Sequence, residues 1–375
     1  MHYLDNSATT RVLPEAADAA LRVMRETFGN PSSQHALGIR AAGVLRDARA
    51  QVAQALGTHP AEIVFTSGGT ESINTALFGA CRKNIHKGKH IITTAIEHSA
   101  TLNSVKKLES EGFTVTYLQP NAAGQIALAD LEAGLRDDTI LLTCMLVNNE
   151  VGTLLPVAEM GRALKKRCPH ALFHVDAVQG LFRVPLTPAK WNCDLMSVSG
   201  HKIGAPKGIG ALYKKHGVNV PPLLYGGGQE SGFRPGTEPL PSIAAFAEAC
   251  RVRALTNQDD SAHIGALSVY LKEQIAQKIP FAVQNGVNDV PHVVNYSFEG
   301  CKSEVLLRVL EMDEVYVSAG SACARGHESH VLAAMGLPKS RIDTALRISF
   351  APFNTAEDVD ALIAAVHKGA TRLRR

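Results

Sequence analysis

The short stretch SGHK (199–202) places a histidine and a lysine side by side, directly after the apolar run DLMSV (194–198). A lysine held at the mouth of a buried strand can lose its proton and form an imine with an aldehyde. A solvated loop is the alternative environment for any single lysine. Asp176 ends another apolar run, LFHVD (172–176). Its carboxylate can cap a following helix, or it can pair with a protonated ring nitrogen.

A third unusual stretch, SGGTE (67–71), has two glycines between an expected strand and an expected helix. Glycines let a backbone approach an anion, and a helix N-terminus supplies unpaired N–H groups and a favourable dipole. Gly69 and Thr70 therefore suit a phosphate, although a tight turn with a threonine cap has the same composition. The stretch lacks the Walker and the dinucleotide-binding patterns. A phosphate cradle, an acid for a ring nitrogen and an imine-forming lysine are together the requirements for pyridoxal phosphate.

A cysteine stands in the small-residue stretch SAGSACARG (318–326), which suits a mobile loop. A free thiol attacks only as the thiolate, so Cys323 needs a nearby base if it is a nucleophile. The remaining six cysteines are expected to be small buried apolar residues. Cys323, His327 and His330 also form C-x3-H-x2-H, which offers three zinc-type ligands. We predict no physiological metal site here, because a fourth ligand is not visible.

Strand and helix patterns alternate from about residue 60 onward. Candidate helices at 70–83 and 157–168 lie between apolar runs, which are EIVFT (62–66), HIITT (90–94), TVTYL (114–118), ILLTCMLV (140–147), LFHVD (172–176), DLMSV (194–198) and IGALY (209–213). This alternation predicts an α/β fold, with a mainly parallel sheet covered by helices on both faces. Ligands bind at the carboxyl ends of such strands, which is where the unusual residues fall.

The pattern changes after about residue 240. A long helical stretch, 242–278, precedes expected strands at 292–298, 315–318 and 346–350 and expected helices at 303–312 and 356–368. We predict a large cofactor-binding domain over residues 15–250. Residues 1–14 and 251–375 are expected to form a smaller α+β domain.

Bulk properties exclude several classes of function. The chain has 375 residues, 45% hydrophobic and 19% charged, with a formal net charge of +3. That charge gives no reason to expect direct binding of nucleic acid or of a membrane surface. No apolar stretch is long enough to span a bilayer, and MHYLDNSATT has no signal-peptide pattern. The odd number of cysteines and the absence of CxxC fit a reducing cytoplasm.

The motifs resemble those of a cysteine desulfurase, within the class V aminotransferase group of fold-type I pyridoxal phosphate enzymes. The resemblance runs nearly end to end. It is carried by YLDNSATT (3–10), FGNPSSQHALG (28–38), FTSGGTES (65–72), EHSA (97–100), NNEVG (148–152), HVDAVQ (174–179), SGHKIGAPKGIGALY (199–213), GGGQESGFRPGTE (226–238), SAGSACA (318–324) and LRISF (346–350).

The resemblance implies a role for each matching residue. Lys202 forms the imine with the cofactor and then moves protons, and His98 stacks on the ring and acts as acid or base. Asp176 pairs with the ring nitrogen and Gln179 with the ring hydroxyl. The phosphate is held by Gly69, Thr70, Ser199 and His201, together with Thr237 from the partner subunit. Asn149 and Arg347 take the substrate carboxylate, for which an arginine offers a bidentate fork.

The resemblance further implies a reaction and its partners. Cys323 takes the sulfur of L-cysteine, becomes a persulfide and passes the sulfur to a protein acceptor, while L-alanine leaves. The active sites are shared in a homodimer. A selenocysteine lyase, another class V enzyme and a non-catalytic sulfur-transfer scaffold are alternatives. A transaminase needs no loop thiol, and a scaffold without cofactor would be colourless.

Three departures from the family pattern bear on the choice of sulfur acceptor. Ser231 replaces a frequent arginine, the segment after Cys323 is shorter than in many members, and Ala351–Pro352 stands where Gly-Arg is common. The acceptor pathway is therefore left open among iron–sulfur cluster scaffolds, tRNA thiolation and DNA sulfur modification.

Overall fold

A seven-stranded sheet forms the centre of the larger part of the molecule. The structure is a computed structural model that describes residues 1–320 and 328–373. The strands are β2 (Ile63–Thr66), β3 (His90–Thr94), β4 (Thr114–Leu118), β5 (Thr139–Met145), β6 (Leu172–Asp176), β7 (Leu195–Ser199) and β8 (Gly210–Lys214). Their order is β2-β8-β7-β6-β5-β3-β4. Only β8 runs antiparallel to its neighbours, so the mainly parallel sheet predicted from the sequence is confirmed.

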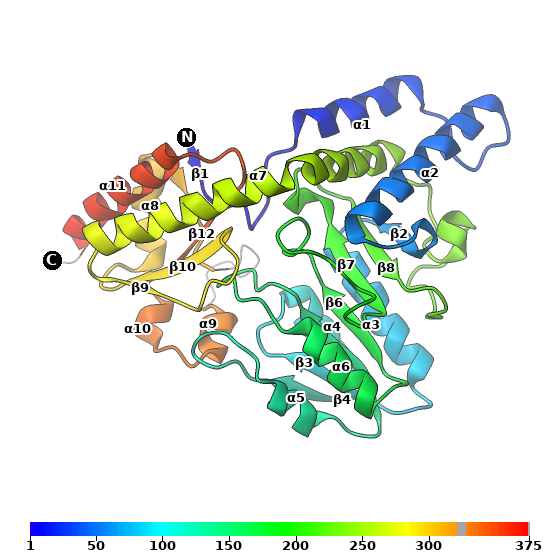
Figure 1. The fold of residues 1–375 in the computed structure, drawn as a ribbon, viewed down its shortest axis with the longest axis horizontal. Helices are drawn as coiled ribbons and strands as arrows, with labels where there is room; N and C mark the ends of the chain where they lie inside the picture. Colours follow the sequence, from blue (N-terminus) through cyan, green and yellow to red (C-terminus); the bar gives the residue numbers. More distant parts are fainter. Residues whose placement is uncertain (321–327, 374–375) are drawn as a thin grey trace.

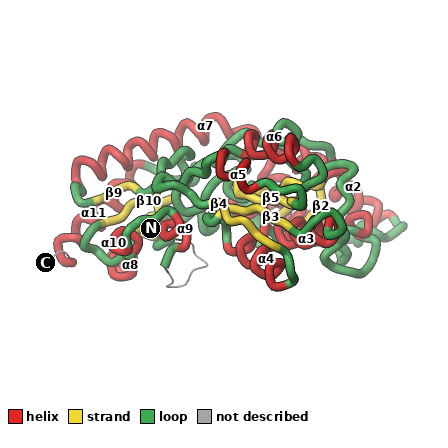
Figure 2. The backbone as a smooth tube through the Cα atoms, turned by 90° about the horizontal axis from the view of Figure 1, so that it is seen from below, coloured by secondary structure: helices red, strands yellow, loops and turns green. Residues whose placement is uncertain are grey.

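Helices cover both faces of this sheet. Figure 2 shows α5 (Leu128–Gly134) and α6 (Val157–Arg167) on one face, and α3 (Gly69–Asn84) and α4 (Ser99–Ser110) on the other. Every residue of β3, β5 and β7 is buried. Strands covered on both faces are expected to be continuous apolar runs, and this explains why they were visible in the sequence.

One long helix, α7 (Leu240–Lys278), runs from the smaller part of the molecule into the larger one (Figure 1). Its first half packs with α1 (Pro14–Glu26) and α2 (Ala36–Leu56) against the large sheet, and Phe246 lies in that core. Its second half contributes Leu271 to a separate core. The domain boundary predicted at residue 250 thus lies inside a continuous helix, and the division into two domains stays a prediction.

The second core surrounds a smaller sheet. Strands β9 (Ala282–Gln284), β10 (Val293–Phe298) and β12 (Ala345–Ser349) are antiparallel, and β1 (His2–Tyr3) pairs with β11 (Val315–Tyr316). The helices here are α8 (Ser303–Met312), α9 (His330–Ala334), α10 (Lys339–Ile342) and α11 (Ala356–Leu373). The N-terminal residues therefore pack with residues that come more than 300 positions later.

Several predicted boundaries are wrong by a few residues. The run predicted to extend to Val147 leaves the sheet at Met145, because Leu146 and Val147 pair with Leu155 and Leu154 of the chain that turns back. Strand β11 ends two residues earlier than predicted. The six cysteines expected to be buried are buried, namely Cys81, Cys144, Cys168, Cys193, Cys250 and Cys301. Within the described residues, no helix is long and apolar enough to cross a membrane.

Candidate active site

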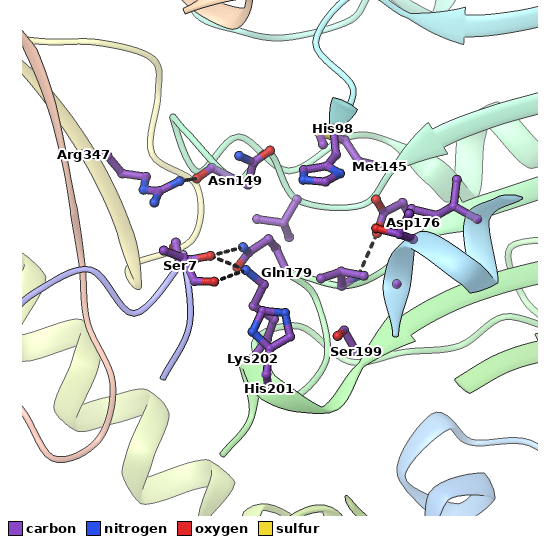
Figure 3. A pocket seen from close by; sticks show the side chains of 16 residues that line it. Ser7, His98, Met145, Asn149, Asp176, Gln179, Ser199, His201, Lys202 and Arg347 are labelled. Atoms are coloured by element: carbon purple, nitrogen blue, oxygen red, sulfur yellow. Dashed lines mark hydrogen bonds between the residues drawn. The ribbon is translucent and has the colours of Figure 1, made fainter. Parts of the chain in front are cut away.

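A cavity of about 220 Å³ opens at the carboxyl ends of the parallel strands. It brings together ten of the residues singled out in the sequence, which are Gly69, Thr70, His98, Asn149, Asp176, Gln179, Ser199, His201, Lys202 and Arg347. Figure 3 shows Arg347 and Asn149 at one end of this cavity, and Asp176 and Ser199 at the other. His98 lies on the opposite side from Lys202 and His201. The remaining lining residues were not predicted and are Ser7, Ala8, Ile73, Met145, Val147 and Val178.

The loop between β2 and α3 has the geometry of an anion cradle. Gly68 has φ 148°, a conformation that side chains rarely adopt, and it precedes the first residue of the 16-residue α3. A Cβ on Gly69 would lie 2.8 Å from Cγ2 of Val178. The glycines therefore let the backbone lie close to the cavity wall. The N–H groups at the start of α3 then lie beside the cavity, where they can bind an anion.

Asp176 places a carboxylate at the buried floor. Only 5% of the residue is exposed, and Oδ1 accepts a 3.0 Å hydrogen bond from the Val178 N–H. Burial raises the pKa of Asp176 to about 6, although the Val178 hydrogen bond and the charge of Lys202 act in the opposite direction. A buried carboxylate with so little compensation favours a cationic partner.

Lys202 lies in a short 3-10 helix, Gly200–Lys202, that follows β7. Its Nζ donates to the carbonyl oxygens of Ser7 and Ala8, at 2.5 and 2.8 Å. Nε2 of Gln179 also donates to the Ser7 carbonyl, at 2.9 Å. The N-terminal segment thus crosses to the cavity and holds the ammonium group. Sequence reasoning missed this contact, and the motif YLDNSATT in the family resemblance was the only available signal.

Both histidines of the cavity are neutral near pH 7. His98 is the N-cap of α4, and its Nδ1 accepts from the Ala100 N–H at 3.1 Å. Burial lowers the pKa of His98 to about 4, with Lys202 and His330 adding to the effect. Burial likewise lowers the pKa of His201 to about 4, and its Nδ1 lies 3.2 Å from Oγ1 of Thr9. Neutral imidazoles can accept a proton or stack on a ring.

Arg347 brings a guanidinium group from β12 to the far end of the cavity. The residue is 1% exposed, and Nη1 donates to the Asn149 carbonyl at 3.0 Å. Nη2 donates to Oδ1 of Asp5 at 2.8 Å. The turn that presents Asn149 is built by Asn148, whose Oδ1 accepts from the N–H groups of Glu150 and Val151. A buried arginine at a cavity wall is suited to a carboxylate.

Two predicted residues that the structure describes, Thr237 and His330, do not line the cavity. Thr237 is exposed and does not line it. Cys323 and His327 lie outside the described residues. His330 is described, and its Nε2 bonds to the carbonyl of Glu97 at 2.9 Å. Over residues 1–320 and 328–373, no group of His, Cys, Asp and Glu is arranged to hold a metal ion.

The two sides of the segment that contains Cys323 are attached close to the cavity. Before it, the backbone groups of Ser318 and Arg347 bond to each other in both directions, at 3.2 and 2.7 Å. After it, Oγ of Ser329 donates to the carboxylate of Glu150, the neighbour of Asn149. Both attachments therefore involve Arg347 itself or the residue next to Asn149.

The α/β core thus carries a cavity that combines the start of α3, a buried acid and a lysine. A family model described as "Aminotransferase class-V" matches residues 2–362. A cysteine desulfurase of Trichormus azollae is 42% identical over 99% of this chain and 93% of its own. The chain therefore belongs to the class V aminotransferase family, and within it to the cysteine desulfurases.

Solved structures agree with this assignment. A NifS-like protein superposes with a TM-score of 0.94 at 36% identity, covering 99% of both chains. A structure described as SspA in complex with cysteine gives a TM-score of 0.84 at 34% identity, covering 95% of this chain and all of the other.

Proposed function

We propose that the protein is a pyridoxal phosphate-dependent cysteine desulfurase that converts L-cysteine to L-alanine and stores the sulfur as a persulfide on Cys323. One observation carries the proposal. The start of α3, the buried Asp176 and Lys202 meet in a cavity whose far end is lined by Arg347. A phosphate, a ring nitrogen, an aldehyde and an amino-acid carboxylate would each find a matching group there.

The cofactor fits the donor set on two structural grounds. The glycine backbone at the start of α3 lies too close to Val178 for a side chain at position 69, and this leaves N–H groups for a phosphate. The buried Asp176 carboxylate lacks a cation of its own within hydrogen-bonding distance among the described residues. When bound, pyridoxal phosphate withdraws electrons from the substrate α-carbon.

The residues of this chain then have defined tasks. Gly69, Thr70, Ser199 and His201 would hold the phosphate, and Gln179 the ring hydroxyl. Lys202 would hold the aldehyde carbon and move the proton at the substrate α-carbon. The neutral His98 would stack on the ring and exchange a proton. Arg347 and Asn149 would orient the substrate by its carboxylate, which fixes the direction in which the thiol points.

One sulfur atom would pass from the substrate to Cys323. The thiolate of Cys323 attacks the substrate sulfur, a sulfur–sulfur bond forms and the carbon–sulfur bond breaks. The carbon fragment keeps the electron pair of the broken bond, takes up protons and leaves as L-alanine. The enzyme keeps one extra sulfur atom, and no external oxidant or reductant is needed.

The test compares Cys323→Ala with Cys301→Ala, because Cys301 is fully buried in the small core. Cys323→Ala is expected to bind the cofactor, change colour when cysteine is added and release no alanine at a useful rate. Cys301→Ala should still release alanine. Mass spectrometry of the native enzyme treated with cysteine should find the extra sulfur on Cys323 alone. Undiminished cysteine turnover by Cys323→Ala would instead favour a selenocysteine lyase.

We further propose a homodimer in which Thr237 reaches the phosphate of the partner's site. Two features support it. Thr237 is exposed in a segment that Arg234 joins to α3. Large apolar side chains are exposed at Tyr225 (82%), at Phe28 (69%) in the loop between α1 and α2, and at Ile39 (63%) on α2. Apolar side chains exposed to this extent favour a covered interface. Sedimentation at assay concentration should give a dimer, and a fully active monomer would refute the proposal.

The sulfur acceptor is proposed to be a protein, and the site of action the cytoplasm. Trapping proteins on the Cys323 persulfide and identifying them by mass spectrometry would name the acceptor.

A further inference from the structure

The segment 226–238, which contains Thr237, is fastened to α2 and α3 by two arginine–carboxylate pairs. In the first, Nη1 and Nη2 of Arg49 bond to the two carboxylate oxygens of Glu230, at 2.7 and 2.6 Å. In the second, Nε and Nη2 of Arg234 bond to the two carboxylate oxygens of Glu71, at 2.8 and 3.2 Å. Both pairs are bidentate, which is the strongest and most directional form of this interaction.

Each pair makes a further contact with a different backbone group. Glu230 accepts a further 3.0 Å hydrogen bond from the Phe65 N–H, inside strand β2. Glu71 accepts a 2.7 Å hydrogen bond from the Ser67 N–H, at the start of the SGGTE loop. The first pair thus fastens the segment to α2 and to strand β2, and the second fastens it to the loop that we propose for phosphate.

Glu71 is a negative charge in an unfavourable place for an anion site. It follows Thr70 directly in the first turn of α3, and only 13% of its side chain is exposed. Burial opposes its ionisation, but the hydrogen bonds from Arg234 and Ser67 outweigh burial and lower the pKa of Glu71. The carboxylate is therefore ionised at neutral pH.

The carboxylate has a structural reason to be there. Its bond to the Ser67 N–H closes the loop before the two glycines, and an acidic side chain in the first turn stabilises a helix. The same charge weakens the positive potential that draws a phosphate to this helix end. Without an oxygen acceptor on residue 71, the Ser67 N–H would lose its hydrogen-bond partner and the loop would loosen. A carboxylate at this position places a negative charge beside the phosphate site, and a cation must compensate that charge.

We propose that Arg234 is a positioning residue that neutralises Glu71, so that the loop closed by Glu71 can still bind the cofactor phosphate. This inference rests on the proposed function, because it names the phosphate of pyridoxal phosphate as the anion. Arg234 does not line the cavity. It acts through Glu71, which separates it from residues that would touch the cofactor.

The experiment measures cofactor affinity in a double-mutant cycle. Wild type, Arg234→Gln, Glu71→Gln and the double variant are freed of cofactor and titrated with pyridoxal phosphate and with pyridoxal, which lacks the phosphate. Arg234→Gln should weaken pyridoxal phosphate binding about tenfold, because an uncompensated carboxylate then faces the anion. Pyridoxal should bind with nearly unchanged affinity. The double variant should recover most of the lost affinity, because the repulsive charge is gone.

The combined variant Arg49→Gln/Glu230→Gln is the matched control, since it removes the other bidentate pair of the same segment and leaves no uncompensated carboxylate near the cradle. If Arg234 acts only by holding the segment, this control should weaken cofactor binding as much as Arg234→Gln does, and Glu71→Gln should restore nothing. Equal losses for pyridoxal and pyridoxal phosphate would also overturn the proposal. Arg234→Lys, which keeps the charge, should retain most of the affinity and serves if Arg234→Gln folds poorly.

Inorganic phosphate separates this inference from the proposed function. If wild type bound no pyridoxal phosphate, the proposed function would fail. A phosphate-dependent rise in Tm that is present in wild type, lost in Arg234→Gln and restored in the double variant would still support the role of Arg234. No such rise in wild type would overturn that role.

Discussion

Replacing Asp176 by asparagine should stabilise the cofactor-free protein while it removes the partner of the ring nitrogen. Asp176 is 5% exposed, and burial is the main cause that raises its pKa to about 6. The folded state therefore holds this proton more tightly than the unfolded chain does. The stabilisation from the protonated form is complete below about pH 4 and is lost as the pH rises through 6.

The size of the effect follows from the shift. A rise of about two pKa units corresponds to about 3 kcal/mol at pH 8, where the folded state must keep a buried carboxylate ionised. Asparagine removes that penalty but brings an amide that needs its own hydrogen bonds. The gain in the free energy of unfolding is thus expected to be positive at pH 8, up to about 3 kcal/mol, and to vanish near pH 4.

The assay is urea unfolding of cofactor-free wild type and Asp176→Asn at pH 4.5, 6 and 8. Asp194→Asn is the control, because Asp194 is 4% exposed but already paired with Nζ of Lys165 at 2.6 Å. That variant should lose stability at pH 8, since it breaks a buried ion pair. If Asp176→Asn were no more stable than wild type at pH 8, or if its advantage did not shrink on acidification, the electrostatic reasoning would be wrong.

Three further outcomes test the proposed roles in the cavity. Borohydride treatment of the cofactor-bound enzyme should label Lys202, Lys202→Ala should abolish turnover, and a label on Lys207 would contradict the assignment. Arg347→Lys should raise KM for L-cysteine by roughly tenfold or more, because the bidentate fork is lost. Binding of cysteamine, which has no carboxylate, should change little, and an equal loss for both compounds would argue against carboxylate recognition. Thr237→Ala should weaken pyridoxal phosphate binding in the dimer but not pyridoxal binding, as measured by titration.

The sequence by itself determined the core of the fold, because each strand of a sheet covered on both faces is a short run of buried residues. Such a run can be recognised without knowing which other segments it contacts. Runs such as HIITT and LFHVD are short and rich in β-branched or apolar residues, and β3 and β6 occupy the same residues as those runs. The carboxyl ends of neighbouring parallel strands meet at one edge, so Asp176 and Lys202 were expected to lie together. The glycines of SGGTE could also be interpreted from the sequence, because few other residues adopt the positive φ angle of Gly68.

Only the tertiary structure decided which distant segments complete the site. Lys202 is held by carbonyls of Ser7 and Ala8, and Arg347 reaches Asp5 and Asn149, across separations of 194 to 342 residues. The pair between Glu71 and Arg234 spans 163 residues. Backbone carbonyls carry no residue-specific signal, and charged residues are common on any surface. Which of them meet is set by how α7 and the two sheets pack, and packing of elements far apart in the chain leaves no periodic pattern in the sequence.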